Sequence, residues 1–410
     1  MKQRLIPILL ALLATMPFSV HSQEEPYHNF IRYSLNELHY DSASPSINRL
    51  FDRWQQVQDT HHGNLSIVHI GSSHVQAGSL PNTVRCNILA DNPGLVGPRG
   101  MIFPYSAAAK CNNPADYRVH CPQRMILTRN VYKEHTYPLG LCGIAVTASD
   151  TLTEIAIVLN EPRVDYATSR VVLLGHSDNG IVPRLRLASR EVYPSYIDAG
   201  TDRYVFNIGQ AVDSFCIVLP CQPGDQFTVT GILLDNRQPG FTYHSIGVNG
   251  AALADYLRCQ NFVRDLRLLH PDVVVFGIGI NDAFGNDFDT AAFRQSYLQL
   301  VDSIRSVNPD CAFIFITNND CFRKTGRRRY KVNPNGPLAR EVFYRLAHDT
   351  DGAVWDQFEV MGGLNSMEKW HKAGLAQKDR VHFTSSGYQL MGTLFYQALD
   401  NAIKKHRNDR

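Results

Sequence analysis

The sequence lacks the residue patterns that most directly indicate a metal site or a membrane protein. Its nine cysteines form no Cys-x-x-Cys pair and no Cys/His group with zinc-site spacing, and the isolated pair His61-His62 is a weak candidate ligand set. Beyond the N-terminus, no segment is long and apolar enough to cross a bilayer. The net charge of +2 over 410 residues argues neither for nor against a polyanionic partner. We therefore expect no metal, no cofactor, no nucleic-acid partner and no stable membrane span.

The only long apolar run lies at the N-terminus. Lys2 and Arg4 precede an apolar stretch over residues 5–20, and Val20-His21-Ser22 offers small residues before a cleavage point. This pattern is typical of a secretory signal peptide and is too short for a membrane span. We predict a cleaved signal peptide over residues 1–22 and a secreted or periplasmic mature protein.

Cysteines in an exported protein meet an oxidising compartment, where some of them can pair. Cys111 with Cys121 and Cys216 with Cys221 are the pairs closest in sequence. Because the count is odd, at least one thiol stays unpaired within a monomer.

Charge is concentrated in one place only, the basic cluster Arg323-Lys324-Thr325-Gly326-Arg327-Arg328-Arg329-Tyr330-Lys331. Such a cluster is either a solvated loop or a contact site for an anionic polymer.

The hydrophobic pattern changes along the chain. From about residue 81 to 240 it consists of short β-like runs separated by turn signals such as Pro223-Gly224-Asp225, which predicts a β-sandwich. After residue 240, apolar strands alternate with helical segments, which predicts a parallel sheet covered on both faces. The expected strands are 272–278, 311–316 and 353–358, and the expected helices are 251–269, 291–307, 337–348 and 387–404.

One strand of the predicted parallel sheet, residues 65–70, lies before the β-rich block, after a helix at 46–58. The simplest account is one α/β domain, built from residues 23–80 and 241–410, with a β-rich domain over 81–240 inserted into it. The fold class is therefore α/β, with a three-layer α/β/α arrangement and an inserted β-sandwich-like domain.

Polar residues with catalytic chemistry follow the predicted strands. Ser73 comes after strand 65–70, Asn281 follows strand 272–278, and Asp379-Arg380-Val381-His382 lies near the C-terminus. The working groups of a parallel sheet lie beyond the carboxyl ends of its strands. A serine hydroxyl is a weak nucleophile, so it needs a base such as His382 and a carboxylate such as Asp379 to orient that base. This set predicts a serine nucleophile with its general base.

These segments resemble the four motifs of the SGNH/GDSL hydrolase family. The matching segments, in order, are Gly71-Ser72-Ser73, Gly247-Val248-Asn249-Gly250, Gly279-Ile280-Asn281-Asp282 and Asp379–His382. The resemblance covers roughly residues 46–78 and 241–405 and implies an SGNH, flavodoxin-like fold. It also implies Ser73, Asp379 and His382 as the triad, with the Ser73 N–H, the Gly250 N–H and the Asn281 amide as the oxyanion hole. Gly247 is the alternative glycine donor.

One position departs from the family pattern. Ser72 stands where the family has an aspartate, and this leaves two adjacent serines. By register Ser73 is the nucleophile, and the alternative is an inactive relative in which both serines only shape the turn. A competing nucleophile, Ser177 in Gly175-His176-Ser177-Asp178-Asn179, fails the G-x-S-x-G pattern at its fifth position. Asp178-Asn179-Gly180 instead predicts a hairpin turn.

Family members with an export signal and a β-rich companion are often carbohydrate or cell-wall O-acetylesterases. The resemblance therefore implies a secreted serine esterase acting on O-acetyl groups of an acylated carbohydrate or peptidoglycan. Two alternatives remain open: an O-acyltransferase with the same triad, and a non-catalytic glycan-binding protein, which is suggested by Ser72.

Overall fold

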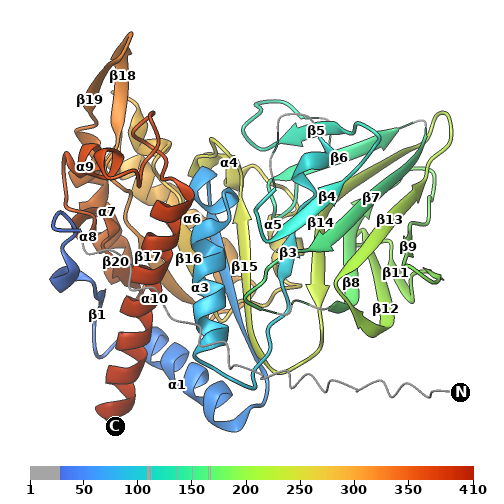
Figure 1. Ribbon diagram of the computed structural model, residues 1–410, viewed down its shortest axis with the longest axis horizontal. Helices are drawn as coiled ribbons and strands as arrows, with labels where there is room; N and C mark the ends of the chain where they lie inside the picture. The colour runs from blue at the N-terminus through green and yellow to red at the C-terminus, as the bar shows by residue number, and fades with distance from the viewer. Residues whose placement is uncertain are drawn as a thin grey trace, which may run out of the picture.

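A computed structural model describes residues 28–410 except 109–110, 112, 136, 150, 165 and 167. The predicted signal peptide, residues 1–22, lies outside the described residues. Figure 1 shows a parallel sheet flanked by helices in one half of the molecule and antiparallel sheets in the other half. Among the residues that the structure describes, no helix combines the length and apolarity needed to span a bilayer.

The first half is built on a six-stranded sheet. Its order is β1 (Leu38–Tyr40), β20 (Ala353–Trp355), β17 (Ala312–Ile316), β16 (Val273–Gly277), β2 (Asn64–Gly71) and β15 (Gly240–Gly247). All neighbours pair in parallel except β1, which runs antiparallel to β20 at the edge. The prediction that residues 65–70 and 272–278 share one sheet is confirmed by the β2–β16 pairing.

Helices cover both faces of this sheet. Because successive strand residues point to opposite faces, Ile67 and Val275 pack in one hydrophobic cluster, and Val68 and Phe276 pack in another. The first cluster takes in α1 (Pro45–Thr60), α3 (Ser79–Ala90), α9 (Ser366–Lys372) and α10 (Ser385–Asn408). The second takes in α4 (Leu253–Leu257), α5 (Phe262–Leu266), α6 (Thr290–Arg305) and α7 (Asn335–Asp349). The predicted three-layer α/β/α arrangement is therefore confirmed.

The second half consists of two antiparallel sheets formed by strands between residues 100 and 235. One contains β11 (Tyr196–Asp198), β12 (Arg203–Val212), β8 (Thr168–His176), β14 (Gln226–Asp235), β6 (Ile144–Ser149) and β5 (Ile126–Arg129), with β3 (Gly100–Ile102) beside β14. The other contains β10 (Glu191–Val192), β9 (Arg184–Arg186), β13 (Ser214–Pro220), β7 (Leu152–Leu159) and β4 (Tyr117–His120). The β-rich part predicted from the sequence is thus present. The proposed domain boundary at residue 81 falls within α3, and we keep it as a prediction.

Two predicted elements are wrong in detail. The expected helix at 251–269 is broken into α4 and α5, because the Asn261 N–H leaves the helical pattern and donates to Leu139 O at 2.9 Å. The expected strand at 353–358 ends at Trp355, since Asp356 caps the short helix α8 (Gln357–Val360) by accepting from Glu359 N. The hydrophobic pattern could not predict either feature, because the first depends on a contact with a distant residue and the second on a side-chain cap.

Candidate active site

The carboxyl ends of three parallel strands meet at the site. Gly71, at the end of β2, lies opposite Gly247 of β15 and opposite Gly277 of β16. A Cβ atom at Gly71 would lie 2.7 Å from Gly277 O, and one at Gly247 would lie 2.7 Å from Ser72 O. Glycine is needed here because the backbones approach too closely for any side chain. The three motifs that follow these strands are therefore brought together.

Ser73, His382 and Asp379 form one hydrogen-bonded chain. Ser73 is the first residue of the short helix α2 (Ser73–Gln76), and its Oγ lies 2.8 Å from His382 Nε2. His382 Nδ1 lies 2.8 Å from Asp379 Oδ2. Because a carboxylate only accepts, Nδ1 donates to Asp379, and in the neutral ring Nε2 is left to accept the Ser73 proton. The structure brings together the three residues predicted from the sequence.

The Asp379 carboxylate is held in its charged form by its own loop. Its Oδ1 accepts hydrogen bonds from the backbone N–H groups of Val381 and His382, at 2.9 and 3.0 Å. Burial alone would raise the pKa of Asp379, but the hydrogen bonds from the His382 ring and from these two N–H groups outweigh it. They lower the pKa to about 2. The carboxylate therefore stays ionised at every pH where His382 can act as a base.

Ser72 is not part of this hydrogen-bonded chain. It is fully buried, and its Oγ has no hydrogen-bond partner within the described part of the chain. Ser73, by contrast, is partly exposed. Of the two adjacent serines, only Ser73 reaches His382.

Asn281 lies at the end of β16 and contacts the segment that follows β15. Its Nδ2 donates to Ala251 O at 2.9 Å, which uses one of its two amide protons. Next to it, Asp282 Oδ1 accepts from Leu253 N at 3.1 Å. Burial raises the pKa of Asp282 to about 6. The motif of Asn281 is thus fixed to the loop that carries Gly250.

Gly250 is the more open of the two glycine candidates. It has a φ of +82°, and nothing lies within 4 Å of a Cβ built on it. Its N–H makes no hydrogen bond with any residue described in the structure. Gly247 instead lies in the β15–β2 ladder, and a Cβ there would lie 2.4 Å from Gln76 N. The geometry leaves the Gly250 N–H available to a ligand.

His74 and Gln76, which follow Ser73 in α2, make hydrogen bonds to neighbouring elements of the site. His74 Nδ1 lies 2.8 Å from the Tyr388 hydroxyl, and Gln76 Oε1 accepts from Asn249 N at 2.7 Å. Burial, and next the charge of His382, lowers the pKa of His74 to about 3, so this ring stays neutral. These two contacts tie the segment that follows Ser73 to α10 and to the segment after β15.

Sequence reasoning missed two tyrosines that hold the strand ends. The Tyr256 hydroxyl donates to Gly71 O at 2.8 Å, and the Tyr105 hydroxyl donates to Gly247 O at 2.9 Å. Both side chains are buried, so neither tyrosine contributes to an exposed aromatic surface. No local pattern marks them, because each contact joins residues far apart in the chain.

Other candidate groups lie away from this site. Ser177 follows β8 in the β-rich part, and its Oγ accepts from Ile181 N at 3.2 Å. Cys111, Cys121 and Cys216 form no disulfide. No group of three or more potential metal ligands occurs among the residues that the structure describes.

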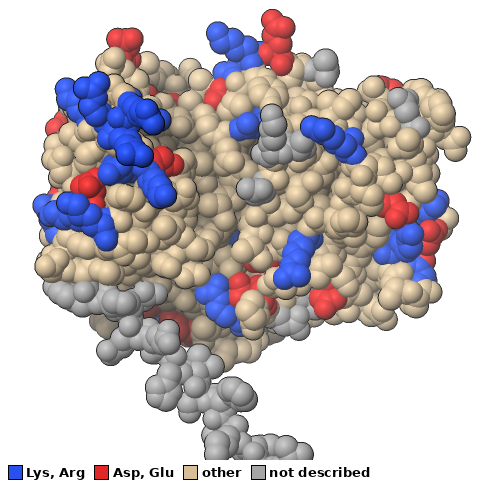
Figure 2. All heavy atoms as spheres, turned by 45° about the horizontal axis from the view of Figure 1, so that its top comes forward, with Lys and Arg blue, Asp and Glu red and all other residues tan. Residues whose placement is uncertain are grey.

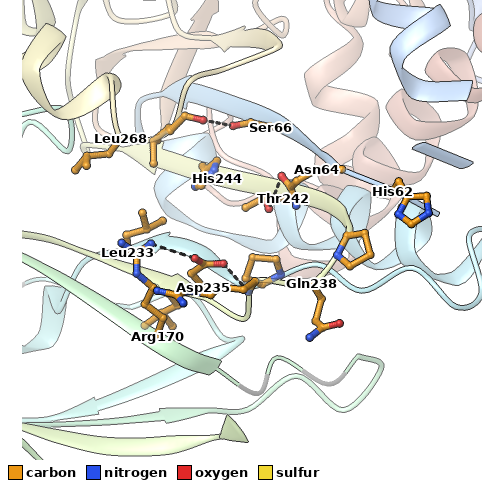
Figure 3. A pocket seen from close by; sticks show the side chains of 16 residues that line it. His62, Asn64, Ser66, Arg170, Leu233, Asp235, Gln238, Thr242, His244 and Leu268 are labelled. Atoms are coloured by element: carbon orange, nitrogen blue, oxygen red, sulfur yellow. Dashed lines mark hydrogen bonds and ion pairs between the residues drawn. The ribbon is translucent and has the colours of Figure 1, made fainter. Parts of the chain in front are cut away.

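A cavity of about 480 Å³ lies at the opposite end of the sheet (Figure 3). It is lined by Asn64, at the start of β2, by Thr242 of β15, and by Arg170 and Asp235 from the β-rich part. Asn64 and Gly71 are the two ends of the eight-residue strand β2, about 23 Å apart along the extended chain. This cavity is therefore remote from Ser73.

Comparison with known proteins agrees with this geometry. Residues 225–390 match the GDSL-like Lipase/Acylhydrolase family. A solved structure titled "Peptidoglycan O-acetylesterase in action" is 21% identical, with a TM-score of 0.72 over 89% of this chain and 97% of that one. Its fold therefore extends over both halves of the molecule.

A GDSL-like lipase from Bacteroides thetaiotaomicron is 19% identical over 39% of this chain and 76% of its own, with a TM-score of only 0.30. No curated protein sequence matches the chain. The family match over residues 225–390 includes the segments of Gly250, Asn281 and the Asp379–His382 loop, and over this part the chain is similar to GDSL-like lipases and acylhydrolases.

Proposed function

We propose that this protein is a secreted serine esterase that removes O-acetyl groups from a cell-wall glycan. Ser73 is the nucleophile, His382 the general base and Asp379 the orienting carboxylate. The observation that carries the proposal is the continuous chain from Ser73 Oγ through His382 to Asp379, with 2.8 Å at both steps.

The reaction follows from these contacts. Ser73 Oγ attacks the acetyl carbonyl carbon while His382 Nε2 takes the hydroxyl proton, and Asp379 stabilises the imidazolium that forms. The negative charge on the carbonyl oxygen is met by the Ser73 N–H, the Gly250 N–H and the second amide proton of Asn281. His382 returns the proton to the departing sugar oxygen. Water, deprotonated by His382, then releases acetate and restores Ser73.

The substrate class is supported by the solved peptidoglycan O-acetylesterase, whose fold covers both the α/β half and the β-rich half. The export signal predicted over residues 1–22 supports the same setting, because cell-wall glycans lie outside the cytoplasm. Fractionation of cells and N-terminal sequencing of the mature protein test the location. A mature N-terminus near residue 23 is expected.

The decisive experiment is acetate release from O-acetylated peptidoglycan, compared with acetylated xylan and a small acetyl ester. Wild type should release acetate and Ser73→Ala should not, while the matched control Ser177→Ala keeps full activity. Transfer of the acetyl group to an added sugar, in place of acetate release, would favour an acyltransferase. Glycan binding without turnover of any ester would favour a binding protein.

A further inference from the structure

A basic hairpin lies next to the loop that holds Asp379 and His382. Its strands β18 (Phe322–Gly326) and β19 (Arg329–Val332) pair in antiparallel fashion and project from the molecule (Figure 1). The basic cluster seen in the sequence is therefore an ordered hairpin, not a loop. No acidic residue occurs between residues 322 and 332.

One side of the hairpin is fixed to the catalytic loop. Phe322 N donates to Arg380 O at 3.0 Å, and the Arg380 guanidinium stacks 4.3 Å from the centre of the Tyr330 ring. Arg380 directly follows Asp379 in the sequence. The hairpin is therefore attached directly to the loop that carries Asp379 and His382.

The other side is fixed to the loop that follows Asn281. Arg323 donates to Gly285 O at 2.8 Å and to the side-chain oxygens of Asn286 and Asn333, both at 2.5 Å. Arg323 thus serves as a structural anchor, and the base of the hairpin touches both loops of the candidate active site. A polymer held at the base of the hairpin would therefore lie beside both loops.

The remaining cations of the hairpin are exposed and form no ion pair with any residue that the structure describes. They are Lys324, Arg327, Arg328, Arg329 and Lys331. Some other surface arginines are paired, as in Arg294–Asp349 and Arg407–Asp59. Figure 2 shows Lys and Arg side chains gathered on this face of the molecule. Five neighbouring cations repel one another, so the arrangement favours binding of an external anion.

We infer that this hairpin binds a glycan polymer whose repeating units carry carboxylates, and that it holds the polymer across the esterase site. The inference rests on the proposed esterase function and narrows its substrate to anionic acetylated glycans. Arginine is suited to this role because its planar guanidinium donates two parallel hydrogen bonds to a carboxylate.

An anionic membrane fits the hairpin less well. Membrane-surface segments combine cations with exposed aromatic or aliphatic side chains that enter the headgroup layer. The hairpin carries two aromatic side chains, Phe322 and Tyr330; both are half-buried, and Tyr330 lies beneath Arg380. The surface offers charge without an apolar anchor.

The test compares two full-length triple variants that remove the same charge. Arg327→Gln/Arg328→Gln/Arg329→Gln changes the hairpin. Lys404→Gln/Lys405→Gln/Arg407→Gln changes the exposed far end of α10 and is the control. In a Ser73→Ala background, which prevents turnover, binding to sacculi of O-acetylated peptidoglycan with carboxylate-bearing peptides is measured against binding to neutral acetylated xylan.

At low ionic strength the hairpin variant should bind sacculi about 10-fold more weakly, and the control should bind within about twofold of the parent. Added salt should remove the difference, because exposed charges are screened beyond about 10 Å at 0.1 M. Equal losses in both variants, or equal losses on sacculi and xylan, would overturn the inference. So would stronger hairpin-dependent binding to vesicles containing phosphatidylglycerol than to sacculi.

Kinetics give a second readout with Ser73 intact. The ratio of kcat/KM on peptidoglycan to kcat/KM on a small acetyl ester should fall about 10-fold in the hairpin variant. An unchanged ratio would mean that the hairpin only shapes the catalytic loops, and would refute the inference. If wild type binds sacculi through the hairpin and hydrolyses no ester, the esterase proposal fails while the binding inference stands.

Discussion

Replacing Asn281 by alanine separates catalysis from folding at this site. The Asn281 Nδ2 donates to Ala251 O at 2.9 Å with one proton, and the proposed mechanism assigns its other proton to the oxyanion. Loss of an oxyanion donor lowers kcat by about 10²–10³, equal to about 2.7–4 kcal/mol of transition-state stabilisation. Loss of the hydrogen bond to Ala251 O lowers the free energy of unfolding by about 1 kcal/mol. We therefore expect a large kinetic effect and a small effect on stability.

The control is Asn308→Ala, which removes a matched contact at the other end of the sheet. Asn308 Nδ2 donates to Pro271 O, also at 2.9 Å, and Asn308 Oδ1 accepts an exposed hydrogen bond from Asp310 N at 3.1 Å. This variant should lose a similar free energy of unfolding, about 1 kcal/mol, and keep its kcat. The assays are steady-state kinetics on a soluble acetyl ester and urea unfolding of both variants. Asn281→Asp should be slower than Asn281→Ala, because a carboxylate repels both the oxyanion and the Ala251 carbonyl.

The two kinetic constants decide the interpretation. An oxyanion donor acts only in the transition state, so kcat should fall far more than KM rises. A variant with nearly normal kcat and a raised KM would show that Asn281 binds substrate in the ground state. Equal kcat in Asn281→Ala and Asn308→Ala would show that Asn281 only ties two loops together. Either result would refute the assignment of its second proton.

Three further predictions concern the triad and its neighbours. On the same ester, Ser73→Ala should lower kcat by a factor of about 10⁴–10⁶, whereas Ser72→Ala should retain most of the wild-type kcat. If Ser72→Ala were the inactive variant and Ser73→Ala the active one, Ser72 would be the nucleophile. Asp379→Asn should lower kcat about 10⁴-fold, because it permits the wrong His382 tautomer; a loss below 10-fold would refute that role. Burial raises the pKa of Asp282 to about 6, so between about pH 4 and pH 6 the folded state keeps a proton that the unfolded state releases. The contribution of Asp282 to the free energy of unfolding therefore decreases as the pH rises through this range. The free energy of unfolding, measured with urea at pH 4 and pH 7, should decrease less between these pH values in Asp282→Asn, by up to about 3 kcal/mol. An unchanged decrease in the variant would show that burial of Asp282 does not cause the pH dependence.

The sequence allowed the active-site groups to be predicted because each follows a strand with a strong apolar pattern. Strand β2 is largely apolar and β16 is a nearly continuous apolar run, and parallel strands place the residues after them at one edge. Ser73 and Asn281 could therefore be assigned to the same place before the structure was known. His382 and Asp379 could be paired because three residues separate them, which a single short loop can span.

The supporting contacts could not be predicted in this way. Tyr256 reaches Gly71 and Asn261 reaches Leu139 through contacts between distant parts of the chain, and these contacts change local structure. The break between α4 and α5 is the clearest case, since the apolar pattern over 251–269 continues through it. Local propensity yields to tertiary contacts whenever a buried backbone group needs a partner.

The β-rich half contacts the segment that carries the proposed glycine donor, Gly250. Tyr105 donates to Gly247 O, the Arg129 guanidinium contacts Asn249 O, and Arg258 Nη2 donates to Asn130 O at 2.8 Å. The hydrophobic residues of both halves also form one continuous cluster. Removing the β-rich strands would leave the parallel sheet without these contacts, so that the Gly250 N–H would lose its fixed direction. Oxyanion stabilisation depends on donors that are already in place; the two halves therefore have to act as one enzyme.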